Sequence, residues 1–258
     1  MQAYTKDFYL DHREGALRSA RVVVPLVLEL IKPKHVLDVG CGIGTWLSIF
    51  KEYGIEDVFG VDGEDLNAEM LLIPREQFLS ADLRIPLYVN RQFDLVMSLE
   101  VAEHLPRECA EVFVDSLTRH GQVVLFSAAT PFQGGANHIN EQWPEYWAQY
   151  FHERGFVAVD CIRPFVWNNK RVDWWYAQNL LLFAKRDYLE NESILKKEYE
   201  TRGKSQLSVV HPMNHVLRRL ACNYRDVPHK RVLKELPTLM KSTLIGKVKT
   251  FPQRRSQC

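Results

Sequence analysis

Acidic and imidazole side chains gather in the middle of the sequence in a pattern that could activate a hydroxyl group. Glu100, Glu103 and His104 occur within EVAEH, where helical spacing places all three on one face. His138 follows within NHINEQW. Two carboxylates and two imidazoles suit Mg²⁺, Mn²⁺ or Fe²⁺ better than a structural zinc, and such an ion could lower the pKa of a bound hydroxyl. In the alternative, the glutamates position neighbouring groups and one histidine acts alone as a base.

A glycine-rich loop precedes this cluster in LDVGCGIGTW, which spans Leu37 to Trp46. A dinucleotide-binding loop would read G-x-G-x-x-G, and a phosphate-binding P-loop would end in Gly-Lys-Ser or Gly-Lys-Thr. This chain has G-x-G-x-G, preceded by Asp38 and followed by Thr45. The pattern weakens both nucleotide-phosphate interpretations. It leaves a loop against which another ligand could lie, because glycine has no side chain to block it.

Two further acidic residues follow the next two β-rich runs. Asp62, in GVDG, comes where an acid can accept hydrogen bonds from ribose hydroxyls. Asp82, in SADL, comes where a carboxylate could meet the amino group of adenine. A glycine loop and two acids at three successive strand ends favour a nucleoside-containing ligand.

The elements that must position these residues form an α/β pattern. From His35 onward, β-rich runs alternate with helix-like stretches, which predicts a parallel sheet with helices on both faces. The last two runs, FVAVDCIR and NLLLFAK, are joined without a convincing helix and read as an antiparallel pair that closes the sheet. Ligands of such sheets lie beyond the carboxyl ends of the strands, where the glycine loop and the acids occur.

Helical segments flank the predicted sheet domain. A helix is expected from Gly15 to Ile31, so residues 1–34 form an N-terminal helical cap, residues 35–187 the sheet domain, and residues 188–258 a helical, basic C-terminal extension. Residues 211–258 hold eleven Lys and Arg against two acidic residues, a net charge of +9, whereas the preceding 22 basic and 30 acidic residues give −8. The two parts differ electrostatically.

The composition of the chain limits the classes of protein to which it can belong. The chain has 258 residues, 46% of them hydrophobic and 25% charged, which is typical of a soluble protein with one main domain. Its five cysteines form no CxxC pair, so neither a disulfide framework nor a cysteine zinc site is indicated. The longest apolar run, VVVPLVLEL, is too short to span a bilayer, and no signal peptide precedes it. We expect a cytosolic protein.

Together, HVLDVGCGIGTW, VFGVDG, SADL and FDLVMSLEVAEHL resemble the successive motifs of class I S-adenosylmethionine-dependent methyltransferases, over about residues 35–185. The resemblance implies a Rossmann-like, seven-stranded sheet whose last strand is antiparallel. It also implies that the methionyl end of the cofactor passes the glycine loop, while its ribose and adenine meet the two later acids. The implied cofactor contacts are Asp38, Gly40, Cys41, Gly42, Gly44, Thr45, Trp46, Asp62, Gly63, Asp82, Leu83, Ser98, Leu99 and Glu100.

The EVAEH segment is also similar to the E-x-x-E-H pattern of ubiquinone-pathway O-methyltransferases and of enzymes that methylate the terminal ribose of small RNAs. In those proteins the pattern supports a divalent ion, and in the RNA enzymes a further histidine after the fifth strand completes the site. The resemblance implies Mg²⁺ or Mn²⁺ on Glu100, Glu103, His104 and His138, with the two histidines as catalytic residues.

The acceptor is indicated by a second resemblance. QGGANHINEQWPEYWAQYF, VDWWYAQNLLLF and the N-terminal FYLDHREGALRSARVVVPLVLEL resemble methyltransferases of bacterial surface-glycan gene clusters, which implies a sugar hydroxyl as acceptor. Indole rings stack on the apolar faces of sugars, so Trp143 and Trp174 are candidate substrate residues. Packing in the core is an equally good interpretation of these two, as it is of Trp147 and Trp175.

Several alternatives stay open. The acceptor could be the ribose of RNA or a small phenolic metabolite, or the chain could be a methyltransferase-like binding subunit without activity. RNA would need a basic surface beside the cleft, whereas the net positive charge lies in the tail. That tail mixes apolar with basic residues and could bring the enzyme to anionic lipid at the inner face of the membrane. It could also bind a nucleic acid or a protein, or simply be a solvated end.

Overall fold

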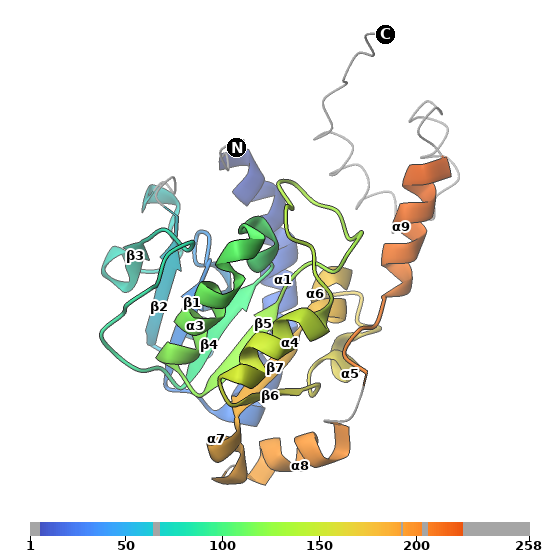
Figure 1. The fold of residues 1–258 in the computed structure, drawn as a ribbon. Coiled ribbons are helices and arrows are strands. Elements are labelled where there is room, and N and C mark those ends of the chain that lie inside the picture. Colours follow the sequence, from blue (N-terminus) through green and yellow to red (C-terminus); the bar gives the residue numbers. More distant parts are fainter. Residues whose placement is uncertain (1–5, 64–67, 192, 203–205, 224–258) are drawn as a thin grey trace. The chain divides into compact units, whose positions relative to one another are not determined.

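The computed structural model describes residues 6–63, 68–191, 193–202 and 206–223 (Figure 1). The chain divides into two compact units, residues 1–214 and residues 215–258. Residues 224–258, which include most of the predicted basic amphipathic segments, lie outside the described residues.

A seven-stranded sheet forms the centre of the first unit, with the order β3-β2-β1-β4-β5-β7-β6. The strands are β1 (His35–Val39), β2 (Asp57–Asp62), β3 (Phe78–Ser80), β4 (Leu95–Leu99), β5 (Val123–Ser127), β6 (Phe156–Val159) and β7 (Leu181–Lys185). Strand β7 runs antiparallel between β5 and β6, while the pairs from β3 to β5 are parallel. The predicted Rossmann-like sheet with a reversed last strand is confirmed.

Helices cover both faces of this sheet (Figure 1). The α-helices are α1 (Lys6–Ile31), α2 (Thr45–Glu52), α3 (Ala110–His120), α4 (Pro144–Glu153), α5 (Arg163–Val166), α6 (Trp174–Asn179), α7 (Arg186–Asn191), α8 (Ser193–Arg202) and α9 (Pro212–Asn223). Short 3₁₀ turns are η1 (Ala68–Met70), η2 (Arg75–Gln77), η3 (Ala102–His104) and η4 (Arg107–Cys109). Helices α1 and α2 pack against one face, and α3 and α4 against the other.

Alternating side chains of the strands divide the core between these faces. In β1, Val36 points into the cluster that contains Val27 of α1, whereas Leu37 points into the cluster that contains Phe113 of α3. All five residues of β4 are buried, as expected for a strand covered on both sides. The side chains that remain for chemistry therefore lie mainly at the strand ends.

The connections differ in detail from the sequence expectations. Helix α1 begins at Lys6, well before Gly15, and the link between β6 and β7 contains the short helices α5 and α6. The compact unit also extends past the predicted boundary at residue 187. The Arg163 guanidinium donates to the Leu207 carbonyl (2.6 Å), and the His211 N–H donates to Oε1 of Gln178 (2.8 Å). These bonds tie residues 206–214 to the sheet domain.

None of the helices within the described residues is long and apolar enough to cross a bilayer.

Candidate active site

The glycine loop connects β1 to α2 in a conformation that suits glycine. Gly40 and Gly44 have φ angles of +87° and +80°, which other residues rarely adopt. A Cβ atom on Gly40 would lie 2.3 Å from Val101, and one on Gly44 would lie 3.0 Å from Ile73. The sequence interpretation ascribed the glycines to the cofactor. At Gly40 and Gly44, the backbone conformation and the neighbouring side chains require glycine even without a cofactor.

Asp62, at the end of β2, holds the glycine loop. Its carboxylate accepts hydrogen bonds from the N–H groups of Gly42 (2.5 Å) and Gly63 (2.7 Å). Burial raises the pKa of Asp62, and these two N–H groups oppose the rise. A carboxylate has about four acceptor positions, so two remain for ligand hydroxyls.

Asp82 follows β3 and already has a partner. The Arg84 guanidinium donates to both of its oxygens (2.8 and 2.7 Å), and these bonds lower the pKa of Asp82. Leu83 separates the two residues. An adenine amino group would share this carboxylate with Arg84, and the predicted adenine contact stays a prediction.

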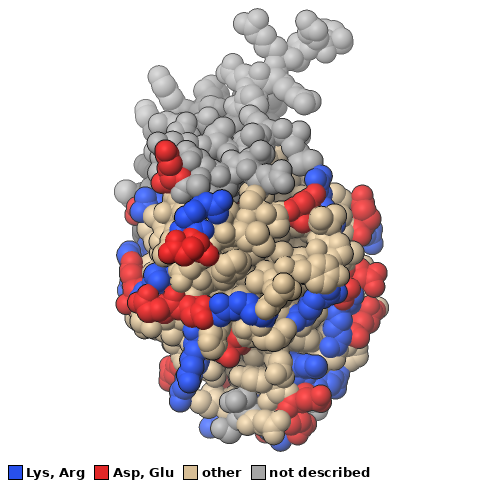
Figure 2. Space-filling model, turned by 90° about the vertical axis from the view of Figure 1, so that its left-hand side faces the viewer, with Lys and Arg blue, Asp and Glu red and all other residues tan. Residues whose placement is uncertain are grey.

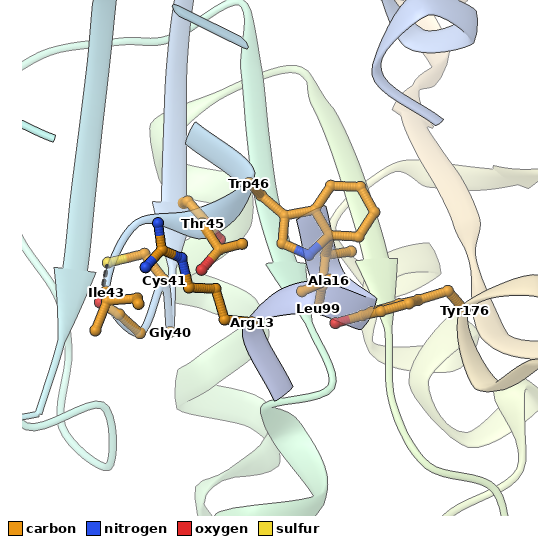
Figure 3. Close-up of a pocket in the computed structure, with 11 residues that line it drawn as sticks. Arg13, Ala16, Gly40, Cys41, Ile43, Thr45, Trp46, Leu99 and Tyr176 are labelled. Carbon is orange, nitrogen blue, oxygen red and sulfur yellow. Dashed lines mark hydrogen bonds between the residues drawn. The ribbon is translucent and has the colours of Figure 1, made fainter. Parts of the chain in front are cut away.

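A pocket opens at the carboxyl end of β1 (Figure 3). Its lining includes residues that the motifs predicted: Asp38, Gly40, Cys41, Gly42, Thr45, Trp46 and Leu99. It also includes Arg13, Ala16, Ile43 and Tyr176, which sequence reasoning missed. Arg13 and Ala16 lie on α1, and Tyr176 lies on α6, so both helices contribute walls to this pocket. No local pattern in the sequence marked these residues.

Asp38 presents a buried carboxyl group to the pocket. The residue is only 2% exposed. Burial and the nearby charge of Asp62 raise its pKa to about 8. A positively charged ligand group, such as an ammonium, would favour the ionised form.

Glu100 begins the segment after β4 but does not lie with the imidazoles. Its φ angle is +56°, and its carboxylate accepts hydrogen bonds from the side-chain amides of Asn179 (3.0 Å) and Gln133 (2.8 Å). Burial raises the pKa of Glu100, and the amide donors oppose the rise. Ser98, predicted beside it, is fully buried in β4. The structure thus separates Glu100 from the other three predicted metal ligands.

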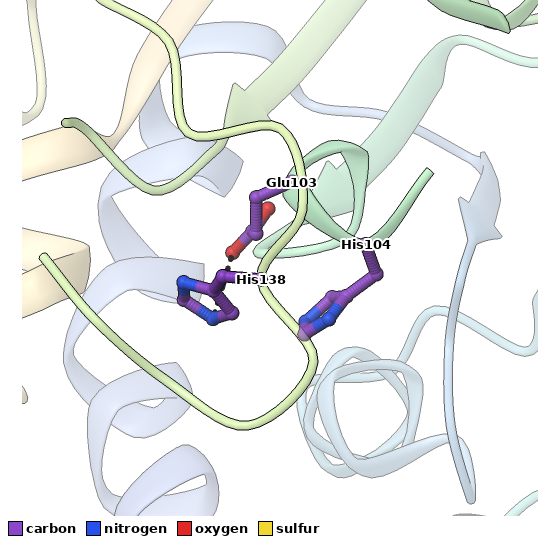
Figure 4. Close-up of side chains that lie close together, drawn as sticks. All are labelled: Glu103, His104 and His138. Carbon is purple, nitrogen blue, oxygen red and sulfur yellow. Dashed lines mark ion pairs between the residues drawn. The ribbon is translucent and has the colours of Figure 1, made fainter. Parts of the chain in front are cut away.

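Those three residues, Glu103, His104 and His138, come together (Figure 4). One ligand atom from each lies within 4.8 Å of the others. The backbone carbonyl of Glu103 accepts hydrogen bonds from the N–H groups of Ile139 (2.9 Å) and Asn140 (3.0 Å). These two bonds hold the loop after β5 against η3, which brings His138 beside Glu103.

The Glu103 carboxylate is fully buried, and neither oxygen has a hydrogen-bond partner among the described residues. Burial and the charge of Glu100 raise its pKa well above the usual range. Backbone N–H groups of Glu103 itself and of Ala129 lie near it without meeting hydrogen-bond geometry. Nε2 of His138 lies 3.9 Å from Oε1 of Glu103, too far for a hydrogen bond. A buried carboxylate without a hydrogen bond is costly, and a cation would offset that cost.

The Nδ1 atom of each imidazole faces an oxygen acceptor. Nδ1 of His138 lies 3.0 Å from Oε1 of Glu141, and Nδ1 of His104 lies 3.3 Å from the Asn137 carbonyl, so each Nδ1 is the donor. In the neutral ring, Nε2 then carries the lone pair. Burial and the neighbouring His138 lower the pKa of His104 to about 4, so this ring is neutral at pH 7. The donor set therefore fits a divalent ion.

Glu141 supports this arrangement and was not identified from the sequence. Besides facing His138, its carboxylate accepts hydrogen bonds from the N–H groups of Phe132 (2.8 Å) and Gly134 (2.6 Å). A carboxylate behind a metal-binding histidine orients the ring. Its position three residues after His138 was the available signal.

The two predicted substrate tryptophans differ in exposure. Trp143, just before α4, is 41% exposed, whereas Trp174 is 7% exposed. Trp147 packs on Phe126 in the core, with ring centroids 5.5 Å apart. Of the two candidates, Trp143 is the one that offers an accessible face to an acceptor.

Known proteins are similar to this chain in sequence and in fold. A family profile described as a methyltransferase domain matches residues 9–176. The chain is 35% identical over 123 residues to a probable chloroplastic tocopherol O-methyltransferase of Oryza sativa subsp. japonica, a match over 42% of this chain and 33% of that protein. The chain thus matches about a third of the length of this curated relative.

Two solved structures share the fold. One is an S-adenosylmethionine-bound amino pentose methyltransferase from Micromonospora echinaspora, with a TM-score of 0.51 and 14% identity over 72% of this chain and 99% of that one. The other is a magnesium protoporphyrin IX methyltransferase from Synechocystis PCC 6803, with a TM-score of 0.50 and 19% identity over 72% and 90%. The family match spans well over half of the chain, which therefore belongs to the methyltransferase domain family.

Proposed function

We propose that this methyltransferase acts on a hydroxyl of a sugar, within a glycan or its nucleotide- or lipid-linked precursor. The observation that carries the proposal is the buried carboxylate of Glu103, which has no hydrogen-bond partner among the described residues and lies beside two imidazoles. An alcohol needs its proton removed or its acidity raised before it can attack a methyl group. A site built for that task points to an oxygen acceptor.

The cofactor would lie along the strand ends. When bound, S-adenosylmethionine supplies a methyl group on a sulfonium sulfur. Its methionyl end would occupy the pocket beside Asp38 and the glycine loop, and its ribose would meet Asp62. Its adenine would lie near Asp82 and Leu83.

Glu103 and His104 would hold a divalent ion such as Mg²⁺ or Mn²⁺, which would supply a Lewis acid beside the acceptor hydroxyl, while the neighbouring His138 would not be a ligand. With a pKa of about 4, His104 is a weak base at pH 7, so the role of ligand suits it better than that of base. The role of base then falls to Nε2 of His138, whose Nδ1 faces Glu141.

The transfer itself is a displacement at carbon. The acceptor hydroxyl loses its proton toward Nε2 of His138, and its oxygen forms a bond to the methyl carbon. The carbon–sulfur bond breaks, and its electron pair stays on sulfur, which leaves as a neutral thioether. Placing the oxygen in line with that bond is the main task of the surrounding residues.

Trp143 is proposed to form part of the acceptor surface. It is exposed and follows the loop that carries His138. The apolar C–H face of a sugar ring could stack on its indole. Ile139 in the same loop is 61% exposed and would extend the apolar surface.

A phenolic acceptor is the second candidate, favoured by the sequence match to a tocopherol O-methyltransferase. The ribose of RNA has less support, since Lys and Arg are interspersed with Asp and Glu on the face in Figure 2. A cytosolic location, with peripheral membrane contact through the tail, stays a prediction because that part of the chain lies outside the described residues.

Incubation of the full chain with methyl-labelled cofactor and panels of nucleotide sugars, glycans, phenols and RNA tests the proposal. We expect label on a sugar, loss of activity in EDTA and its return with Mg²⁺ or Mn²⁺. Trp143→Ala should raise the KM for the sugar at least about fivefold, while Tyr53→Ala, another exposed aromatic, should not. Label on phenols alone would contradict the sugar assignment, and full activity in EDTA would contradict the ion.

A further inference from the structure

The cofactor pocket contains a cation that none of the methyltransferase motifs accounts for. Arg13 extends from α1 toward the glycine loop, beside Cys41 and Thr45 (Figure 3). Its Nε atom is buried and has no hydrogen-bond partner among the described residues. A buried donor without a partner is costly, so this guanidinium is suited to an anion that enters the pocket.

Helix α1 is held firmly enough to place Arg13 there. Five residues further along the helix, Nη2 of Arg18 donates to the Asp173 carboxylate (2.6 Å), and the Asp173 N–H donates to Oγ of Ser19 (3.0 Å). A Cβ atom on Gly15 would lie 2.2 Å from Oδ2 of Asp173, so a glycine permits this close approach. The contacts fix the segment that carries Arg13 against the residues preceding α6.

The pocket offers both signs of charge to a ligand. Asp38 presents a buried carboxyl group, and Arg13 presents a guanidinium. An α-amino acid has the complementary pair, an ammonium and a carboxylate on one carbon. S-adenosylmethionine carries such a group at the end that is expected to lie in this pocket.

We propose that Arg13 binds the carboxylate of the cofactor's amino-acid end, which makes α1 part of the cofactor site. The planar guanidinium can donate two parallel hydrogen bonds to a carboxylate, an arrangement that lysine cannot reproduce. The proposal depends on the cofactor alone and is independent of the acceptor. Asp38, across the pocket, receives the ammonium.

Calorimetry of the full chain with two ligands isolates the carboxylate. S-adenosylmethionine and its decarboxylated form differ in that group alone. Arg13→Gln should weaken binding of S-adenosylmethionine about 10- to 100-fold and change binding of the decarboxylated form less than about twofold. The affinity of Arg13→Lys for S-adenosylmethionine should lie between those of Arg13→Gln and the wild type. Arg21→Gln, a matched change on the same helix at a residue paired with Glu52, should affect neither ligand.

Equal losses for both ligands would overturn the proposal, because Arg13 would then act on the shape of the pocket. No loss for either ligand would overturn it as well. The wild type provides a test that does not require a folded variant: it should bind the decarboxylated form about 10- to 100-fold more weakly, and equal affinity would contradict the proposal. A wild type that binds neither ligand would overturn this proposal together with the cofactor assignment.

Discussion

The cofactor half and the acceptor half of this site are built in different ways. The proposed cofactor half comprises residues 38–46 and Asp62, joined by hydrogen bonds such as that from the Gly42 N–H to the Asp62 carboxylate. The acceptor half comprises residues 100–104 and 130–143, held by contacts between distant segments such as Asn179 to Glu100. A site formed by neighbouring residues can be recognised as a motif in the sequence. A site assembled from distant segments is harder to recognise, because its residues are scattered along the chain.

The two halves also differ in how their charges are satisfied. Asp62 has two backbone donors, while neither oxygen of Glu103 has a hydrogen-bond partner among the described residues, and Oε1 lies 3.9 Å from Nε2 of His138. The carboxylate that supports the glycine loop is thus hydrogen-bonded without a ligand. The proposed acceptor half holds a buried carboxylate without a hydrogen bond, which a cation would stabilise, so the two halves should respond differently to mutation and to metal.

The largest expected effect separates transfer from cofactor binding. His138→Ala removes the proposed base, so we expect transfer to fall at least about 10²- to 10⁴-fold while cofactor affinity changes less than about twofold. His104→Ala should do the same if an ion is shared. Methyl-transfer assays and calorimetry measure the two quantities, with the exposed His152→Ala as control. A matched loss of cofactor affinity would contradict the division into halves.

A pH effect should appear in the cofactor half. The folded-state pKa of Asp38, about 8, lies above its ordinary value of 3.8. Asp38 therefore contributes stability at low pH that is lost as the pH rises toward 8, up to about 4 kcal/mol between pH 5 and pH 8. Asp38→Asn should remove this part of the loss of stability between pH 5 and pH 8. Urea unfolding at several pH values measures it, and parallel curves for both proteins would refute the assignment.

A divalent ion should stabilise the protein through the acceptor half. At a hundredfold excess over its dissociation constant, Mn²⁺ or Mg²⁺ should add about 2.7 kcal/mol to the free energy of unfolding. Thermal melting with and without the ion measures the gain. Glu103→Gln should abolish it, whereas Glu52→Gln, on the surface, should retain it. An equal gain in the Glu103 variant would place the ion elsewhere.

A smaller loss is expected when the glycine loop is altered. Asp62→Ala removes the proposed ribose acceptor and the support of Gly42, and Gly42→Val adds branched bulk at a residue with a φ angle of +54°. Each should weaken cofactor binding at least about tenfold, or ~1.4 kcal/mol, by calorimetry. Unchanged affinity in both folded variants would remove the loop from the cofactor site.

The smallest effect should come from the exposed pair beside the proposed adenine site. Arg84→Ala releases both oxygens of Asp82, which an adenine amino group could then use fully. We expect cofactor affinity to rise, by less than about fivefold, because exposed ion pairs contribute little. A large loss in calorimetry would show that Arg84 itself contacts the cofactor.

Sequence reasoning predicted those features of the fold and the site that local patterns encode. The strand runs predicted the sheet because a buried parallel strand needs a short apolar run, and the glycine spacing marked the loop because positive φ angles need glycine. Arg13 and Tyr176 were missed because only the packing of α1 and α6 brings them to the pocket. Helical spacing suggested that Glu100 shares a face with Glu103. The left-handed backbone at Glu100 breaks that spacing and turns its side chain to Asn179.

A series of hydrogen bonds supports the Glu100 carboxylate, and it affects the order in which the site forms during synthesis. His211 donates to Gln178, Gln178 donates to Asn179 (2.9 Å), and Asn179 donates to Glu100. The ribosome releases the glycine loop first and these partners last. The nascent chain can therefore shape its cofactor loop early, whereas the support of Glu100 stays incomplete until residue 211 has left the exit tunnel.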